Sequence, residues 1–226
     1  MKETEAHHPL TDFIEYGEEE MLARAQAHYQ EVKRRHSIRQ FSDRAVPQAI
    51  IEQCIQTAAT APSGANHQPW HFVAINDPKV KAQIRHEAEA LERSFYEGRG
   101  GEEWLEALKP LGTDANKSYL ERAPWLIAVF SQKRGGMDND DSKTNYYVHE
   151  SVGIATGFLL QALHHAGLGT LTHTPKPMSF LSKVCGRDTD VDRPYMLIVA
   201  GYPDEGASIP DHAAKKKSIA DVCTFM

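Results

Sequence analysis

The sequence predicts an α+β fold, in which a sheet carries helices on both faces. The chain has 226 residues, 41% of them apolar and 25% charged, which suffices for one sizeable core. Helix-like and strand-like segments also mix without the strict β-α-β alternation of a parallel sheet. No repeat or linker divides the chain, so one domain over residues 1–226 is the simplest interpretation.

Apolar residues at helical spacing predict the helices. In the clearest case Pro47 suits a first helical position, and an apolar stripe follows from Ile50 to Ala59. The turn residues after Ala61 end that helix. The expected helices cover residues 17–34, 47–60, 79–96, 145–166 and 178–185.

Four short apolar runs predict strands, because each is bounded by turn residues. They are Trp70 to Ile75, Pro124 to Ser131, Thr170 to Thr174 and Tyr195 to Ala200. Residues 135–142 are expected to form a polar loop and residues 202–226 a polar tail.

The connection after the third helix is long and rich in glycine, with a short helical piece near Trp104. Such a partly ordered connection is often a lid over a site, so we expect a helical lid at about residues 92–118.

Composition excludes several classes of protein. A net charge of −6 argues against a nucleic-acid partner. The three cysteines are too few and too far apart for a disulfide framework or a zinc site, and no metal is expected. The longest run without Asp, Glu, Lys or Arg, Ser151 to Pro175, contains too many polar residues and glycines to cross a bilayer. The N-terminus lacks the apolar stretch of a signal peptide, so we expect a soluble cytoplasmic protein without membrane contact.

A basic segment, Lys33 to Arg39, follows the first expected helix. Cations at the C-terminal end of a helix complement its dipole and need no ligand. Alternatively, the planar guanidinium groups of arginine match phosphate oxygens and would form a phosphate clamp. Neither G-x-G-x-x-G after a strand nor a Walker A sequence occurs, which disfavours the common dinucleotide and P-loop sites.

Two further segments join this one. The loop Ala61 to Trp70 could merely connect a helix to a strand, but Asn66 and Gln68 could also pair with the edge of a heterocycle. The segment Gly167 to Pro175 could be an ordinary edge strand, although its hydroxyl groups could also bind a flavin.

Together these segments resemble the nitroreductase superfamily of FMN enzymes. The stretches RRHSIRQF, APSGANHQPW, AGLGT and TPKP occur in the expected order within residues 25–220. The resemblance implies a mixed, mainly antiparallel sheet flanked by helices, and an intertwined homodimer with FMN at the subunit interface.

The lid is similar to that of the iodotyrosine deiodinase family, which reductively removes halogen from halotyrosines. The resemblance implies that Glu92, Tyr96 and Lys117 bind the zwitterion of the amino acid, with Trp104 as an anchor between them, and that the backbone N–H of Ala65 meets the phenolate. Spacing i, i+4 agrees, because it puts Glu92 and Tyr96 on one helix face. A solvated charged helix is the alternative interpretation.

The resemblance also implies which residues contact FMN. Thr174 is the expected catalytic residue, with its hydroxyl near flavin N5, and Lys216 is the expected phosphate ligand in the run 215–217. The resemblance further implies that Pro62, Ser63 and Gly64 contact the FMN of the partner subunit. The remaining contacts are Arg35, His36, Ser37, Ile38, Arg39, Pro62, Ser63, Gly64, Asn66, Thr172 and His173.

His36 stands where the family often has a second arginine. If its charge binds phosphate, FMN affinity falls as pH rises through the imidazole pKa, between about pH 6 and pH 8.

The expected activity is FMN-dependent conversion of halotyrosine to tyrosine and halide. An NAD(P)H-dependent nitroreductase or quinone reductase is the alternative, and a flavin-binding or flavin-processing protein without an aromatic substrate is a second one. The electron donor, the proton source and the halogen preference stay open.

Overall fold

The computed structural model describes residues 7–138 and 140–226, except for the side chain of residue 141. The chain forms two compact units, one ending at Arg34 and one beginning at Arg35. The first contains α1 (Glu18–Val32), which confirms the expected first helix. No side chain of α1 is buried, and Met21, Leu22 and Tyr29 are more than half exposed.

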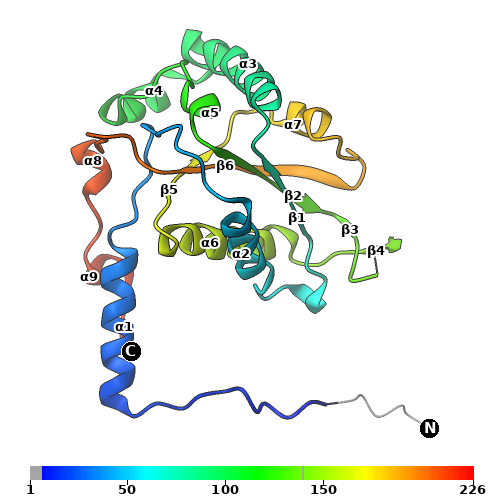
Figure 1. Cartoon of the computed structure of the whole chain (residues 1–226), viewed down its shortest axis with the longest axis vertical. Coiled ribbons are helices and arrows are strands. Elements are labelled where there is room, and N and C mark those ends of the chain that lie inside the picture. Colours follow the sequence, from blue (N-terminus) through cyan, green and yellow to red (C-terminus); the bar gives the residue numbers. More distant parts are fainter. Residues whose placement is uncertain (1–6, 139) are drawn as a thin grey trace. The chain divides into compact units, whose positions relative to one another are not determined.

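The second unit is built on an antiparallel sheet (Figure 1). Within the described residues its four strands run in the order β1 (Trp70–Ile75), β2 (Trp125–Gln132), β6 (Asp192–Gly201) and β5 (Gly169–His173). The strands β1, β2 and β5 match the expected strands to within one residue. The expected strand from Tyr195 begins earlier, because the polar start of β6 pairs with the end of β2.

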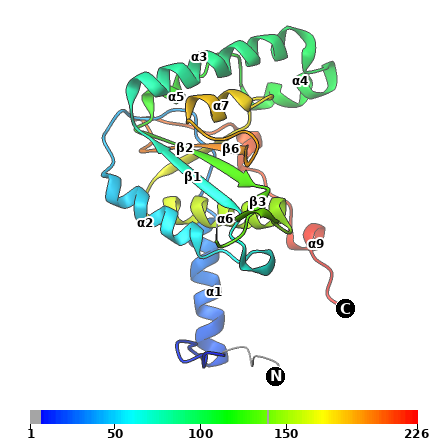
Figure 2. The same cartoon turned by 90° about the vertical axis from the view of Figure 1, so that its right-hand side faces the viewer.

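Helices cover one face of the sheet with α3 (Pro78–Ser94), α5 (Tyr119–Arg122) and α7 (Ser179–Val184), as Figure 2 also shows. Ile84 and Leu181 are fully buried in the core between these helices and the sheet. The Asp77 carboxylate caps α3 by accepting hydrogen bonds from two backbone N–H groups of its first turn.

The opposite face carries α2 (Gln48–Ala59) and α6 (Val148–His165). Ile51 of α2 and Leu159 of α6 pack in a second core against Ile127 of β2. The central strand β2 is therefore buried on both faces, which explains its unbroken apolar sequence. Both expected helices are confirmed, as is the α+β class. Within the described part of the chain, no helix combines the length and hydropathy needed to cross a bilayer.

Several expectations for loops are wrong in detail. The expected polar loop at 135–142 contains a hairpin of β3 (Arg134–Gly135) and β4 (Asp140–Thr144). Its exposed polar side chains hide the alternation that identifies a strand. The tail also contains two single-turn helices, α8 (Asp211–Ala214) and α9 (Ile219–Val222), which are too short for periodicity to reveal.

The lid is more helical than its glycines suggest. The third helix ends as α at Ser94 and continues as a π-helical turn, Phe95–Arg99, so Tyr96 lies in the π turn. A short helix α4 (Glu102–Leu108) and a 3₁₀ turn (Lys109–Leu111) follow. Single π turns are uncommon and often occur at functional sites.

The basic segment lies along the outer edge of β5. Ser37 forms a parallel bridge with Thr170, and the backbone N–H of Ile38 donates to the Thr170 carbonyl at 3.1 Å. Gly169 permits this approach, because a methyl group on its Cα would overlap Cδ1 of Ile38. Two segments that lie 133 residues apart in the sequence are thus paired by backbone contacts.

Gly169→Ala is expected to destabilise the protein by about 1–3 kcal/mol, the usual effect of overpacking. Ile38→Val removes the Cδ1 atom that would be hit, so the double variant should be more stable than the sum of the two single effects. Urea unfolding of the four proteins measures this difference. Strictly additive effects would show that Ile38 does not pack against Gly169.

Candidate active site

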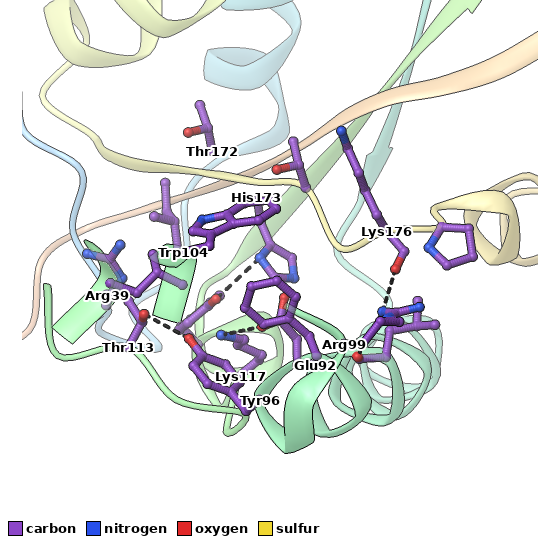
Figure 3. Close-up of a pocket in the computed structure, with 17 residues that line it drawn as sticks. Arg39, Glu92, Tyr96, Arg99, Trp104, Thr113, Lys117, Thr172, His173 and Lys176 are labelled. Atoms are coloured by element: carbon purple, nitrogen blue, oxygen red, sulfur yellow. Dashed lines mark hydrogen bonds and ion pairs between the residues drawn. The ribbon is translucent and has the colours of Figure 1, made fainter. Parts of the chain in front are cut away.

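A cavity of about 630 Å³ lies between the lid and the end of β5 (Figure 3). It brings together eight of the residues predicted from the sequence, which come from five separate segments. These are Arg39, Glu92, Tyr96, Trp104, Lys117, Thr172, His173 and Thr174. The cavity therefore joins the expected substrate residues to part of the expected cofactor residues.

Glu92 and Lys117 form an ion pair on the lid side of this cavity. The Glu92 Oε2 atom lies 3.2 Å from Lys117 Nζ, and the side chains are only 16% and 6% exposed. Glu92 comes from the last turn of α3, and Lys117 from the loop before α5. Little water screens the two charges, so each of them interacts strongly with a group of opposite sign.

Tyr96 adds a hydroxyl group beside this pair. Its phenol donates a hydrogen bond to Thr113 Oγ1 at 2.8 Å, and Lys117 Nζ lies 5.6 Å from the centre of its ring. Burial raises the pKa of Tyr96, and the negative charges of Glu92 and Asp114 support that direction. The phenol is therefore neutral near pH 7 and acts as a hydrogen-bond donor.

Aromatic side chains form the outer wall of the cavity. The rings of Phe95 and Trp104 meet edge to face at 5.1 Å between centroids, and Trp104 is 55% exposed. Arg99 ties the lid to the loop after Thr174, because its Nη2 donates to the Lys176 carbonyl at 2.8 Å. The lid is thus fastened to the loop on the other side of the cavity, as Figure 3 shows.

The inner wall contains a buried pair, Tyr119 and His173. The Tyr119 hydroxyl lies 3.5 Å from His173 Nδ1, and His173 Nε2 is buried without a hydrogen-bond partner among the described residues. Burial, with the charges of Lys117 and Arg39, lowers the pKa of His173 to about 3. Burial also raises the pKa of Tyr119. Both side chains are therefore neutral at physiological pH.

The outer edge of β5 offers backbone groups to a ligand. Because the Thr170 carbonyl points outward to Ile38, the alternation of an antiparallel strand turns the N–H and C=O of Thr172 to the same side. Thr172 and His173 both line the cavity, but the side chain of Thr172 is exposed and that of His173 is buried. This edge can bind a flat heterocycle with both donors and acceptors.

Cations gather beside this edge. Burial is the largest cause of a lowered pKa at His36, and the charges of Lys216 and Arg35 lower it further. These three side chains come from the segment after α1 and from the tail, and they repel one another. An anion such as a phosphate would relieve this repulsion. Among the lysines 215–217, Lys216 is the one that acts on His36.

The loop predicted to contact the flavin lies elsewhere in the subunit. None of Pro62, Ser63, Gly64, Ala65 and Asn66 lines the cavity. The Gly64 N–H instead donates to Ser151 Oγ of α6 at 3.3 Å.

The backbone of this loop is strained. Ala65 and Asn66 have positive φ values of 50° and 55°, as does Gln68 with 49°. Such strain in non-glycine residues is concentrated at functional sites.

Some lining residues were missed in the sequence. Thr113 precedes Lys117 by four residues and Tyr119 follows it by two, but neither type of side chain stands out in the sequence without the Tyr96 and His173 contacts. Arg99 was missed because it lies in a charged stretch of the lid, where charged side chains are normally exposed to solvent.

The donor set fits FMN. The cation cluster and Ser37 suit its phosphate, the outward edge of β5 suits the heterocycle, and Arg39 lines the cavity. The fold and site thus define a class of proteins that hold a phosphorylated flat heterocycle at a sheet edge under a helical lid. Residues 32–202 match the model of the nitroreductase family.

Relatives and solved structures narrow the class. An iodotyrosine deiodinase of Haliscomenobacter hydrossis is 48% identical over 96% of this chain and 97% of its own length. The human iodotyrosine deiodinase 1 is 43% identical over 87% of this chain and 68% of its own length. A crystal structure of oxidized iodotyrosine deiodinase bound to FMN and 3-iodo-L-tyrosine superimposes with a TM-score of 0.72 at 32% identity, covering 88% of this chain and 100% of that one. The chain belongs to the nitroreductase family and, within it, to the iodotyrosine deiodinases.

Proposed function

We propose that this protein binds FMN and reductively removes halide from halotyrosines. The observation that carries the proposal is the buried Glu92–Lys117 pair, which faces the same cavity as the edge of β5. The crystal structure of the relative that holds FMN and 3-iodo-L-tyrosine supports it.

The Glu92–Lys117 pair is complementary to an amino-acid zwitterion. The carboxylate of Glu92 suits an α-ammonium group, and the ammonium of Lys117 suits an α-carboxylate. A zwitterion inserted between them turns one buried ion pair into two, so neither charge is left unpaired. When the substrate binds, the single O–H of Tyr96 turns from Thr113 Oγ1 and donates its hydrogen bond to the carboxylate. The site therefore selects amino acids over simple phenols.

Residues on both sides of the cavity hold the cofactor. Arg35, His36, Ser37, Ile38 and Lys216 surround the phosphate, and Arg39 lies nearer the ring system. Thr172, His173 and Thr174 run along the isoalloxazine, with the Thr174 hydroxyl as the catalytic hydrogen-bond donor. Bound FMN supplies the two electrons that the reaction consumes.

The remaining chemistry belongs to the protein. Halotyrosine, two electrons and one proton give tyrosine and halide, so the ring carbon must gain a proton as the halide leaves. Glu92 and Lys117 fix the amino-acid end and thereby orient the ring. Phe95 and Trp104 close over it and exclude water.

A homodimer would complete the site. Pro62, Ser63, Gly64, Ala65 and Asn66 lie outside the cavity of their own subunit, and the proposal assigns them to the flavin and phenolate of the partner subunit. Apolar side chains that lack cover support this assembly. Among them are Ile154 and Phe158 on α6, Ile219 and Val222 on α9, and Phe225.

Steady-state assays with 3-iodotyrosine and with a nitroarene test the proposal. Supplied with dithionite as reductant, the purified holoprotein should release iodide from 3-iodotyrosine at a higher kcat/KM than it reduces the nitroarene with NAD(P)H. Efficient nitroarene reduction without iodide release would identify a nitroreductase instead. Bound flavin without either activity would indicate a flavin-binding protein.

Burial and the neighbouring charges lower the pKa of His36 in the protein without FMN, so full protonation of this imidazole requires a lower pH than usual. Phosphate favours the charged imidazole, so the pKa is higher with FMN than without it, and affinity gained at low pH is lost as pH rises through the bound-state pKa. We expect affinity to be flat above about pH 7 and to rise by up to about tenfold toward pH 5, relative to His36→Gln. Fluorescence titration of both proteins with FMN measures the ratio and cancels the titration of the phosphate itself. A ratio independent of pH would show that His36 contributes no charge.

A further inference from the structure

A stripe of charged residues on α3 faces the loop that carries Lys117. Arg85, Glu89 and Glu92 follow at spacings of four and three residues, which places them on one face of the helix. Glu92 holds the Lys117 ammonium, whereas Glu89 accepts a hydrogen bond from the Lys117 backbone N–H at 2.8 Å. The stripe therefore contacts both the side-chain ammonium and the backbone N–H of Lys117.

Arg85 holds Glu89 in place. Its Nε donates to the same Glu89 oxygen at 2.7 Å, and its Nη2 donates to Asn116 Oδ1 at 3.2 Å. Asn116 Oδ1 also accepts a hydrogen bond from the Ser118 N–H at 3.2 Å. Arg85 thus holds the residue before Lys117 directly, and the Asn116 side chain links it to the residue after Lys117.

Glu89 is ionised in this network. Burial favours its neutral form, but the hydrogen bonds from Arg85 and from the Lys117 N–H outweigh burial and lower its pKa. Its side chain is 17% exposed and does not line the cavity. Contact with a ligand in the cavity is therefore made by Lys117, and Glu89 acts behind it.

We propose that Glu89, held by Arg85, is a positioning residue that fixes the backbone of Lys117 and so directs its ammonium at the α-carboxylate of the substrate. A lysine side chain has many rotamers, and a fixed backbone limits the places that its ammonium can reach. The inference rests on the proposed function, because it gives Glu89 a role only toward amino-acid substrates. It predicts that Glu89 adds to the preference for halotyrosine over a halophenol that Glu92 and Lys117 create.

Two variants at Glu89 separate the hydrogen bond from the charge. Leucine in Glu89→Leu cannot accept the Lys117 N–H, whereas the amide oxygen in Glu89→Gln can. We expect Glu89→Leu to weaken 3-iodotyrosine binding by about tenfold and Glu89→Gln by less than about threefold. Binding of 2-iodophenol, which lacks the amino-acid group, should not change in either variant. Flavin fluorescence of the holoprotein measures all dissociation constants.

Glu87→Leu is the matched control. Glu87 lies on the same helix, and its side chain makes no ion pair with residues 113–118 in the described part of the chain. This variant should bind both ligands as the unaltered protein does. Loss of affinity there would show that any leucine on α3 disturbs the site, and would overturn the inference.

A double-variant cycle with Lys117→Met tests the route of the effect. Without the lysine ammonium, Glu89→Leu should add no further loss of 3-iodotyrosine affinity. Equal losses for 3-iodotyrosine and 2-iodophenol, or an additive cycle, would overturn the inference. If Glu89→Leu does not fold, the cycle is made with Glu89→Thr, whose shorter side chain cannot reach the Lys117 N–H.

A failure of the proposed function would look different. In that case the unaltered holoprotein itself would show no preference for 3-iodotyrosine over 2-iodophenol. A preference that is as large in Glu89→Leu as in the unaltered protein contradicts only the role of Glu89.

Discussion

Replacing Glu92 with glutamine is expected to weaken 3-iodotyrosine binding by about 100-fold while FMN stays bound. The change removes the charge that pairs with the substrate α-ammonium in a site where the side chain is only 16% exposed. Truncating one partner of a buried charge pair at an interface costs about 3 kcal/mol, which corresponds to about 100-fold. Titration of flavin fluorescence with 3-iodotyrosine measures the loss.

The control for Glu92→Gln is the flavin itself. The absorbance spectrum and the FMN dissociation constant should match those of the unaltered protein, because the cations at Arg35 and Lys216 lie in other segments. Unchanged 3-iodotyrosine affinity would show that the lid residues bind no zwitterion, and would favour a flavoprotein without an amino-acid substrate.

Lys117→Met is expected to have an effect of similar size, about 100-fold on 3-iodotyrosine binding. The variant removes the partner of the substrate α-carboxylate and leaves the Glu92 carboxylate without its ion pair. The same titration with 3-iodotyramine, which has the ammonium but no carboxylate, separates the two charges. The unaltered protein and Lys117→Met should bind 3-iodotyramine with similar affinity.

The two lid variants should therefore respond differently to this ligand. Glu92→Gln should lose affinity for 3-iodotyramine, because the ammonium group of the ligand loses its charged partner. Lys117→Met should keep its affinity for 3-iodotyramine. If Lys117→Met loses as much affinity for 3-iodotyramine as for 3-iodotyrosine, the lysine supports the structure of the lid and does not bind the carboxylate.

Most of the regular elements could be predicted because their buried positions leave a recognisable pattern of apolar residues in the sequence. The helix α2 has its apolar stripe, and β2 is an unbroken apolar run because both of its faces are covered. The hairpin of β3 and β4 escaped prediction, because its exposed polar residues carry no period. The π turn after Ser94 was also missed, since one wide turn changes the spacing of only a few residues.

The resemblance to a known family predicted that certain side chains from separate segments meet, whereas the roles of these side chains toward a ligand stay predictions. The lid residues Glu92, Tyr96 and Lys117 do line one cavity with Thr172 and Thr174. The neutral pair Tyr119 and His173, and the support that Glu89 gives to Lys117, depend on contacts between segments far apart in the sequence. No local pattern encodes such contacts, so they required the structure.

The role of the loop 62–66 stays a prediction. Its positive φ values show that folding holds it in an unfavourable backbone conformation. Within one subunit it packs against α6 rather than against the cavity. A ligand of the partner subunit would account for both facts.

Anaerobic single turnover tests the proposed function most directly. Holoprotein reduced with dithionite, freed of excess reductant and mixed with 3-iodotyrosine, should release one iodide and form one tyrosine for each FMN oxidised. Two electrons and one proton per halide fix that stoichiometry. Oxidation of the flavin without iodide, or no oxidation at all by bound 3-iodotyrosine, would contradict reductive dehalogenation by this protein.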